Sequence, residues 1–198
     1  MKRMALCLGA LCLAPFLISL AHAHKDKAHQ HDAANVNIAV DGARVHIVLE
    51  SPLANLLPFE HAPATLEQRQ EVKEMARRMH QAETLFQLTP AAECRLENVR
   101  LASEKLDAAL LDPNSPLEPA QAAGGKGQRG KGKKAAKEEH GDLDADFLFT
   151  CAKPDKLNSV DVLLFAAWPG LKRIEAQAVT PKGQRAAKLT AKKHLISW

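Results

Sequence analysis

The sequence predicts an α+β domain: an antiparallel β-sheet or small sandwich with one main helix and a disordered central loop. Apolar and polar residues alternate over residues 35–50 and again from residue 142 onward, which is typical of half-buried strands. Apolar side chains recur at helical spacing over residues 65–86. Residues 112–139 have no apolar pattern, and Pro and Gly interrupt them throughout. Strands that outnumber helices in this way favour an α+β class with a single domain over residues 35–198.

Residues 1–23 have the three parts of a secretory signal. Lys2 and Arg3 precede an apolar run, and Ala21-His22-Ala23 forms a small-x-small cleavage site. The apolar run is short for a membrane span. We therefore expect cleavage after Ala23, export to a periplasm and a mature form without a membrane anchor.

A flexible, polar arm is predicted over residues 24–34, because this stretch lacks apolar periodicity. A hairpin follows from Asn35 to Glu50, with Asp41-Gly42 as its two-residue turn. One face of the hairpin is expected to enter the core. The other face is expected to carry Arg44, His46 and Glu50.

Three prolines, Pro52, Pro58 and Pro63, are expected to keep residues 51–64 irregular. The helix then begins at Thr65, because Thr65 and Gln68 have the spacing of a capping box. Its apolar stripe continues to Phe86, and Thr89-Pro90 provides a stop. The two methionines of this stripe, Met75 and Met79, are expected to pack in the core rather than to bind metal.

Further strands are predicted in the remaining chain. The stretch CRLENVRLA predicts a strand, and SEKLDAALL allows a short helix. After the central loop, LDADFLFTC, SVDVLLFAAW, LKRIEAQAV and RAAKLTA all predict strands, separated by turns at Pro169-Gly170 and TPKGQ.

The mature chain keeps two cysteines, Cys94 and Cys151. An isolated pair in an exported protein is expected to form a disulfide, which stabilises the fold by roughly 4 kcal/mol for a loop of this length. Thiolate metal ligation is the alternative.

Composition gives no support for catalysis or for nucleic-acid binding. The chain has 27 Lys plus Arg against 23 Asp plus Glu, and two of the basic residues belong to the signal, so the mature charge is close to neutral. The tract GGKGQRGKGKK lacks the Walker pattern of a phosphate loop. No serine lies in a recognisable nucleophile motif, and there is no tyrosine. We therefore expect a protein that is not an enzyme.

Histidine is the residue type that offers chemistry. The arm carries His24, His29 and His31, while His61 lies among the prolines next to Glu60, and His140 ends the central loop with Asp142 close by. Neutral imidazole binds Zn²⁺, Cu²⁺ and Ni²⁺, and carboxylates complete or orient such sites. Each histidine also has a plain alternative, as a solvated arm residue or a structural side chain. We expect no ligand role for His46, His80 or His194.

The stretches NLLPFEHAP, HGDLDADFLFTC and DVLLFAAWPGLKRIEAQ, with the closing LISW, resemble the ZrgA-like family of periplasmic zinc-uptake proteins. The resemblance spans nearly the whole mature chain. It implies zinc binding in the periplasm in support of a high-affinity zinc importer, with the importer's binding protein as a partner. The ligands that it implies are His29, His31, Glu60, His61 and His140, together with a disulfide between Cys94 and Cys151.

The central loop departs from this family. Relatives often carry a tract rich in His, Asp and Glu there, whereas this chain has GGKGQRGKGKKAAKEEH, whose protonated lysines repel cations. The leading hypothesis is a non-catalytic zinc-binding accessory protein, with zinc preferred over other borderline divalent metals. The alternative is an envelope interaction protein that binds an anionic partner through the basic loop.

Overall fold

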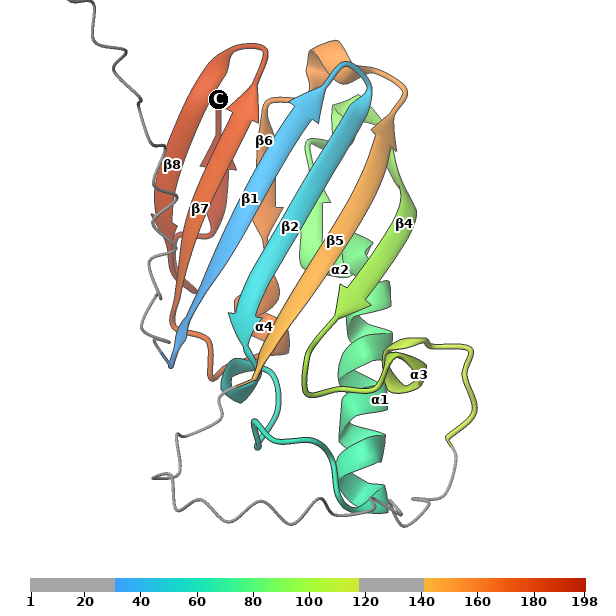
Figure 1. Cartoon of the computed structure of the whole chain (residues 1–198). Helices are drawn as coiled ribbons and strands as arrows, with labels where there is room; N and C mark the ends of the chain where they lie inside the picture. The colour runs from blue at the N-terminus through green and yellow to red at the C-terminus, as the bar shows by residue number, and fades with distance from the viewer. Residues whose placement is uncertain (1–30, 118–140) are drawn as a thin grey trace, which may run out of the picture.

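The computed structural model of the chain describes residues 31–117 and 141–198 (Figure 1). Several of the features predicted above lie outside these ranges. They are the signal sequence, the arm as far as residue 30 with His24 and His29, the central loop from residue 118 to 139, and His140.

Six strands form the larger sheet, sheet A, in the order β4-β5-β2-β1-β7-β8. Neighbouring strands are antiparallel except β1 and β7, which run parallel. The prediction of an antiparallel sheet or small sandwich is therefore confirmed in part: sheet A is mixed, because the chain passes behind the sheet before it enters β7 beside β1. The strands are β1 (Ala33–Asp41), β2 (Arg44–Pro52), β4 (Cys94–Ala102), β5 (Asp142–Cys151), β7 (Arg173–Thr180) and β8 (Gly183–Leu189).

A second layer covers one face of sheet A. It contains sheet B, three short antiparallel strands in the order β3-β6-β9, and the helices, of which α1 is the longest in the described chain. Figure 1 shows α1, α2, α4 and β6 behind sheet A. The elements are α1 (Leu66–His80), α2 (Ala82–Leu85), α3 (Ala108–Leu111), α4 (Leu164–Ala167), β3 (Phe86–Leu88), β6 (Ser159–Val162) and β9 (Leu195–Ser197), with 3₁₀ turns η1 (Leu53–Asn55), η2 (Pro90–Ala92) and η3 (Pro154–Lys156).

The hydrophobic core lies between the two layers. Alternate residues of the central strands face it, as the hairpin pattern predicted, and the rings of Phe147 and Phe86 meet across it at a centroid distance of 5.0 Å. Met75 and Met79 of α1 are buried in the core, which confirms their packing role. No helix in the described parts of the chain has both the length and the apolar content needed to cross a membrane.

Helix α1 begins as predicted but ends earlier. The Thr65 side chain accepts a hydrogen bond from the backbone N–H of Gln68, and the Gln68 side chain accepts one from that of Thr65, so the capping box is confirmed. The helix stops at His80 rather than continuing to Phe86. Residues 86–88 form β3 instead, because they pair with β6, and strand pairing overrides the helical spacing.

The first hairpin is shifted by small amounts from its prediction. Strand β1 begins at Ala33, inside the predicted arm, because residues 33 and 34 pair with the start of β7. The two turn residues are Gly42 and Ala43, not Asp41 and Gly42, since Asp41 still pairs with β2. Gly42 has a φ of 55°, in the left-handed region that glycine adopts without strain.

Three other predicted boundaries are wrong. Pro52 is the last residue of β2 and does not interrupt it. The apolar run SVDVLLFAAW changes from strand to helix after Val162, since periodicity alone does not separate the two in a short apolar run. The start of the predicted disordered loop is ordered: the Lys73 ammonium donates to the carbonyl oxygens of Asp112 (2.6 Å) and Ser115 (2.5 Å), which attaches residues 112–117 to α1.

Candidate metal site

One end of sheet A gathers the described residues that were predicted to bind metal. The last residue of β2, Pro52, pairs with the first residue of β5, Asp142. Strand β1 starts at this same end, since Asn35 pairs with Glu50 near the end of β2. His31 immediately precedes β1, and Glu60 and His61 belong to the segment that leaves β2. Three regions that were predicted to supply metal ligands therefore lie at this end of sheet A.

Asn55 anchors the start of β1 at this end of sheet A. Its side-chain oxygen accepts a hydrogen bond from the backbone N–H of Asp32, and its amide nitrogen donates to the carbonyl of Ala33, both at 2.8 Å. The amide also donates to the hydroxyl of Ser51, at 3.2 Å. Asn55 is buried, so its hydrogen bonds hold the residue that follows His31 at a fixed place. Sequence reasoning missed this residue, although a lone Asn within an apolar stretch was an available signal.

Gly141 brings the start of β5 against the segment that contains Glu60. Its carbonyl accepts a hydrogen bond from the backbone N–H of Leu53, at 2.8 Å. A Cβ added at Gly141 would lie 2.8 Å from the backbone oxygen of Glu60 and 2.7 Å from the Lys105 Cγ. Only glycine allows so close an approach. His140, which lies outside the described residues, is bonded directly to Gly141.

His61 has a defined ring orientation. Its Nδ1 lies 2.9 Å from the carbonyl oxygen of Ala62, and because a carbonyl can only accept, Nδ1 carries the proton. The ring stacks on Phe59, with the centroids 5.2 Å apart and the planes 26° from parallel. The other nitrogen, Nε2, makes no hydrogen bond to the described chain, and the residue is exposed. An imidazole held through Nδ1–H presents Nε2 as a metal ligand.

The predicted carboxylates differ in their surroundings. Glu60 is partly buried, and one of its carboxylate oxygens, Oε1, is inaccessible to solvent. Asp142 is also partly buried and lies on the outward face of sheet A, where the alternation of β5 also places Asp144 and Asp146. These positions would allow Glu60 and Asp142 to act as oxygen donors or as supports for imidazole ligands.

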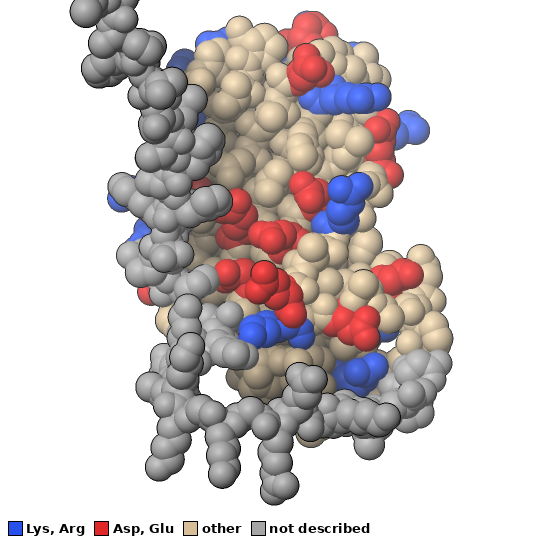
Figure 2. All heavy atoms as spheres, viewed as in Figure 1, with Lys and Arg blue, Asp and Glu red and all other residues tan. Residues whose placement is uncertain are grey.

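Acidic side chains gather on the outward face of sheet A next to this end. Figure 2 views this face and shows several carboxylates across it. The pKa of Asp144 is raised. The largest single cause is the partial burial of its side chain, which remains exposed in part, and the charges of the other carboxylates around it raise the pKa further. The charges that act on it are those of Glu50, Asp142, Asp146 and Glu104. These neighbouring carboxylates make the local potential negative, and such a potential attracts cations.

The described residues alone do not complete a metal site. Within residues 31–117 and 141–198, no group of three or more His, Cys, Asp or Glu side chains has the geometry to hold a metal ion. Three histidines are engaged elsewhere: His46 with the Asp146 carboxylate at 3.1 Å, His80 with the Leu111 carbonyl at 3.2 Å, and His194 with the Asp161 carboxylate. A metal site at this end of sheet A therefore needs ligands from outside the described ranges. His24, His29 and His140 all belong to those other residues.

Cys94 and Cys151 form a disulfide between directly opposed residues of β4 and β5. The predicted pairing is confirmed. The alternative of thiolate metal ligands is excluded, because each sulfur is bonded to the other.

Comparison with known protein families identifies the chain. No curated protein matches it. The family model described as "ZrgA family zinc uptake protein" matches residues 28–198, which is most of the chain and all of the described structure. The resemblance found in the sequence motifs is thereby confirmed. The chain belongs to the ZrgA family of zinc uptake proteins.

Proposed function

We propose that the protein is a non-catalytic, periplasmic zinc-binding accessory protein that assists high-affinity zinc uptake. Family membership supports the link to zinc uptake. The observation that carries the binding role is the exposed His61 ring, whose Nδ1–H donates to a backbone carbonyl while Nε2 makes no hydrogen bond to the described chain. Bound in this way, the ring needs no reorientation to accept an ion, which lowers the ordering cost of binding.

In this proposal His61 and His140 are the two imidazole ligands of the folded domain. Gly141 lies against the backbone of Glu60. His61 directly follows Glu60, and His140 directly precedes Gly141, so each imidazole ligand is the immediate neighbour of a residue in this contact. Glu60 and Asp142 supply oxygen donors or orient the imidazoles. Such mixed nitrogen and oxygen sets bind zinc well, at about 2.0–2.2 Å for each ligand atom, and they also bind other borderline divalent metals.

The histidines at the N-terminal side form the second part of the proposal. His24, His29 and His31 act as a capture arm. Asn55 anchors Asp32, so the C-terminal part of this arm lies at the same end of sheet A as His61. The negative potential around Asp144 adds a general attraction for cations. Zinc collected by the arm would pass to the folded site and then to the binding protein of an importer.

Isothermal titration of the mature protein with Zn²⁺ tests the folded site. The double variant His61→Ala/His140→Ala is expected to lose more than about 10-fold in affinity, since even groups that only support metal ligands contribute that much. His46→Ala is the matched control, because His46 is an exposed histidine that bonds to Asp146 on the outward face of the sheet. Equal affinity in the double variant and in wild type would reject the folded site.

A further inference from the structure

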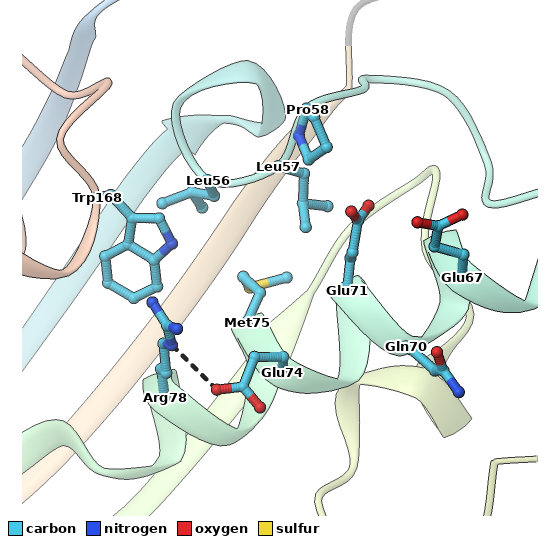
Figure 3. Close-up of a pocket in the computed structure, with 10 residues that line it drawn as sticks. All are labelled: Leu56, Leu57, Pro58, Glu67, Gln70, Glu71, Glu74, Met75, Arg78 and Trp168. Atoms are coloured by element: carbon cyan, nitrogen blue, oxygen red, sulfur yellow. Dashed lines mark hydrogen bonds and ion pairs between the residues drawn. The ribbon is translucent and has the colours of Figure 1, made fainter.

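A groove lies beside the proposed metal site and is separate from its ligands. It runs between α1 and the segment Leu56–Pro58, has a volume of about 530 Å³ and is closed at one end by Trp168 (Figure 3). Its floor is apolar and its α1 side is acidic, as the labelled side chains show. The floor residues are Leu56, Leu57, Met75 and Trp168, all of them mostly buried in the fold.

The acidic wall comes from one face of α1. Glu67, Glu71 and Glu74 are spaced by four and three residues, which places them together on the helix surface. Glu74 is neutralised, because it pairs with Arg78 at 3.1 Å and also with Arg77. Glu67 and Glu71 form no ion pair with any residue of the described ranges. Two carboxylates therefore border an apolar floor without a cation of their own among these residues.

We propose that this groove binds a segment of a partner protein that places apolar side chains on the floor and Lys or Arg side chains against Glu67 and Glu71. Charge complementarity selects this class of partner, since a cationic segment supplies the charge that the wall lacks. The basic tract 126–137 of the chain itself fits less well, because it contains no apolar side chain larger than Ala.

The location of the groove suggests its use. Pro58 lines the groove and lies two residues before Glu60 and three before His61. A partner seated there would lie next to the proposed zinc ligands, where an ion could pass between the two proteins. This purpose rests on the proposed function, whereas the docking itself does not.

Trp168 makes the docking measurable. The chain has two tryptophans, so Trp198→Phe leaves Trp168 as the single fluorophore of the mature protein, inside the groove. The probe is a synthetic peptide with two leucines flanked by lysines. One matched peptide has glutamate in place of every lysine, and another has serine in place of every leucine. We expect only the first peptide to change Trp168 emission in a saturable way, with an affinity that falls as salt is added.

Charge-reversal variants test the wall. Glu67→Lys/Glu71→Lys is expected to weaken the leucine–lysine peptide by about 10-fold or more, since two attractive pairs become repulsive. Glu97→Lys/Asp155→Lys is the matched control: it changes net charge equally at exposed positions outside the groove and should stay within about twofold of wild type. Glu67→Gln/Glu71→Gln provides a milder variant if charge reversal impairs folding.

Several outcomes would overturn the proposal. One is equal binding of the three peptides, and another is equal loss in the groove and control variants. Self-association that disappears in Glu67→Lys/Glu71→Lys would assign the groove to a second copy of the chain. Tighter peptide binding after deletion of residues 126–137 would assign it to the chain's own basic tract. Zinc titration of the same variants separates this proposal from the function, because each can fail while the other holds.

Discussion

Replacement of Gly141 by alanine perturbs the contact on which the proposed site depends. The added Cβ would lie 2.7–2.8 Å from the Lys105 Cγ, the Glu60 backbone oxygen and the Leu53 Cδ1. Ordinary carbon contacts lie near 3.5–4.0 Å, so each neighbour would have to move by roughly 1 Å. The Lys105 Cγ belongs to a flexible side chain, but Leu53 is fully buried and Glu60 contributes main chain.

The expected cost follows from these contacts. Overpacking of this kind destabilises by about 1–3 kcal/mol, and the reduced freedom of the unfolded chain returns about 0.4–1 kcal/mol. A net loss of about 1–2 kcal/mol in the free energy of unfolding should lower Tm by about 2–8 °C for a chain of this size. Zinc affinity should fall by about 10-fold, because the Glu60–His61 segment and the start of β5 are forced apart.

Thermal and denaturant unfolding measure the first effect, and zinc titration of the folded variant measures the second. Gly170→Ala is the matched control, since a Cβ there would meet only the Asn55 backbone oxygen, at an ordinary 3.7 Å. Wild-type stability in Gly141→Ala would refute the packing argument. Reduced stability with unchanged zinc affinity would refute the link between this contact and metal binding.

Two further predictions concern stability. The pKa of Asp144 in the folded protein is raised above its ordinary value of 3.8. Protonated Asp144 therefore contributes to the free energy of unfolding below pH 3.8, and this contribution is lost as pH rises through the folded pKa. Asp144→Asn should therefore be more stable than wild type at pH 7, by about 0.5 kcal/mol after solvent screening, and equal to it at pH 3; a less stable variant at pH 7 would contradict the assignment. The Cys94–Cys151 disulfide closes a separation of 57 residues, so Cys94→Ser/Cys151→Ser should lose about 4 kcal/mol in urea unfolding, and a loss below about 1 kcal/mol would exclude the chain-entropy account.

Local signals in the sequence predicted the fold where neighbouring residues decide the structure. The capping box at Thr65 and the alternation of the first hairpin are of this kind, and both were found. The strand at Phe86–Leu88 was not predicted, because it forms only by pairing with residues more than 70 positions away. The parallel pairing of β1 with β7 was missed for the same reason, since it depends on the path of the chain behind the sheet.

The candidate site was predicted in part. The resemblance to the ZrgA family singled out His61, and the structure adds the Nδ1 hydrogen bond and the Phe59 stacking that orient its ring. The sequence did not reveal the roles of Asn55 and Gly141. Asn55 stabilises this end of sheet A through hydrogen bonds, and Gly141 does so through close packing. Such roles depend on residues that are distant in the chain, so no local pattern records them. The proposed partnership of His61 with His140 stays a prediction.

Diffraction from crystals of the mature protein grown with zinc, measured at the zinc absorption edge, tests the central claim most directly. Anomalous scattering locates zinc independently of any assumption about its ligands. We expect a zinc ion within about 2.0–2.1 Å of the His61 Nε2, with an imidazole nitrogen of His140 in the same coordination shell. Zinc bound elsewhere, with the His61 Nε2 still in contact with solvent, would contradict it.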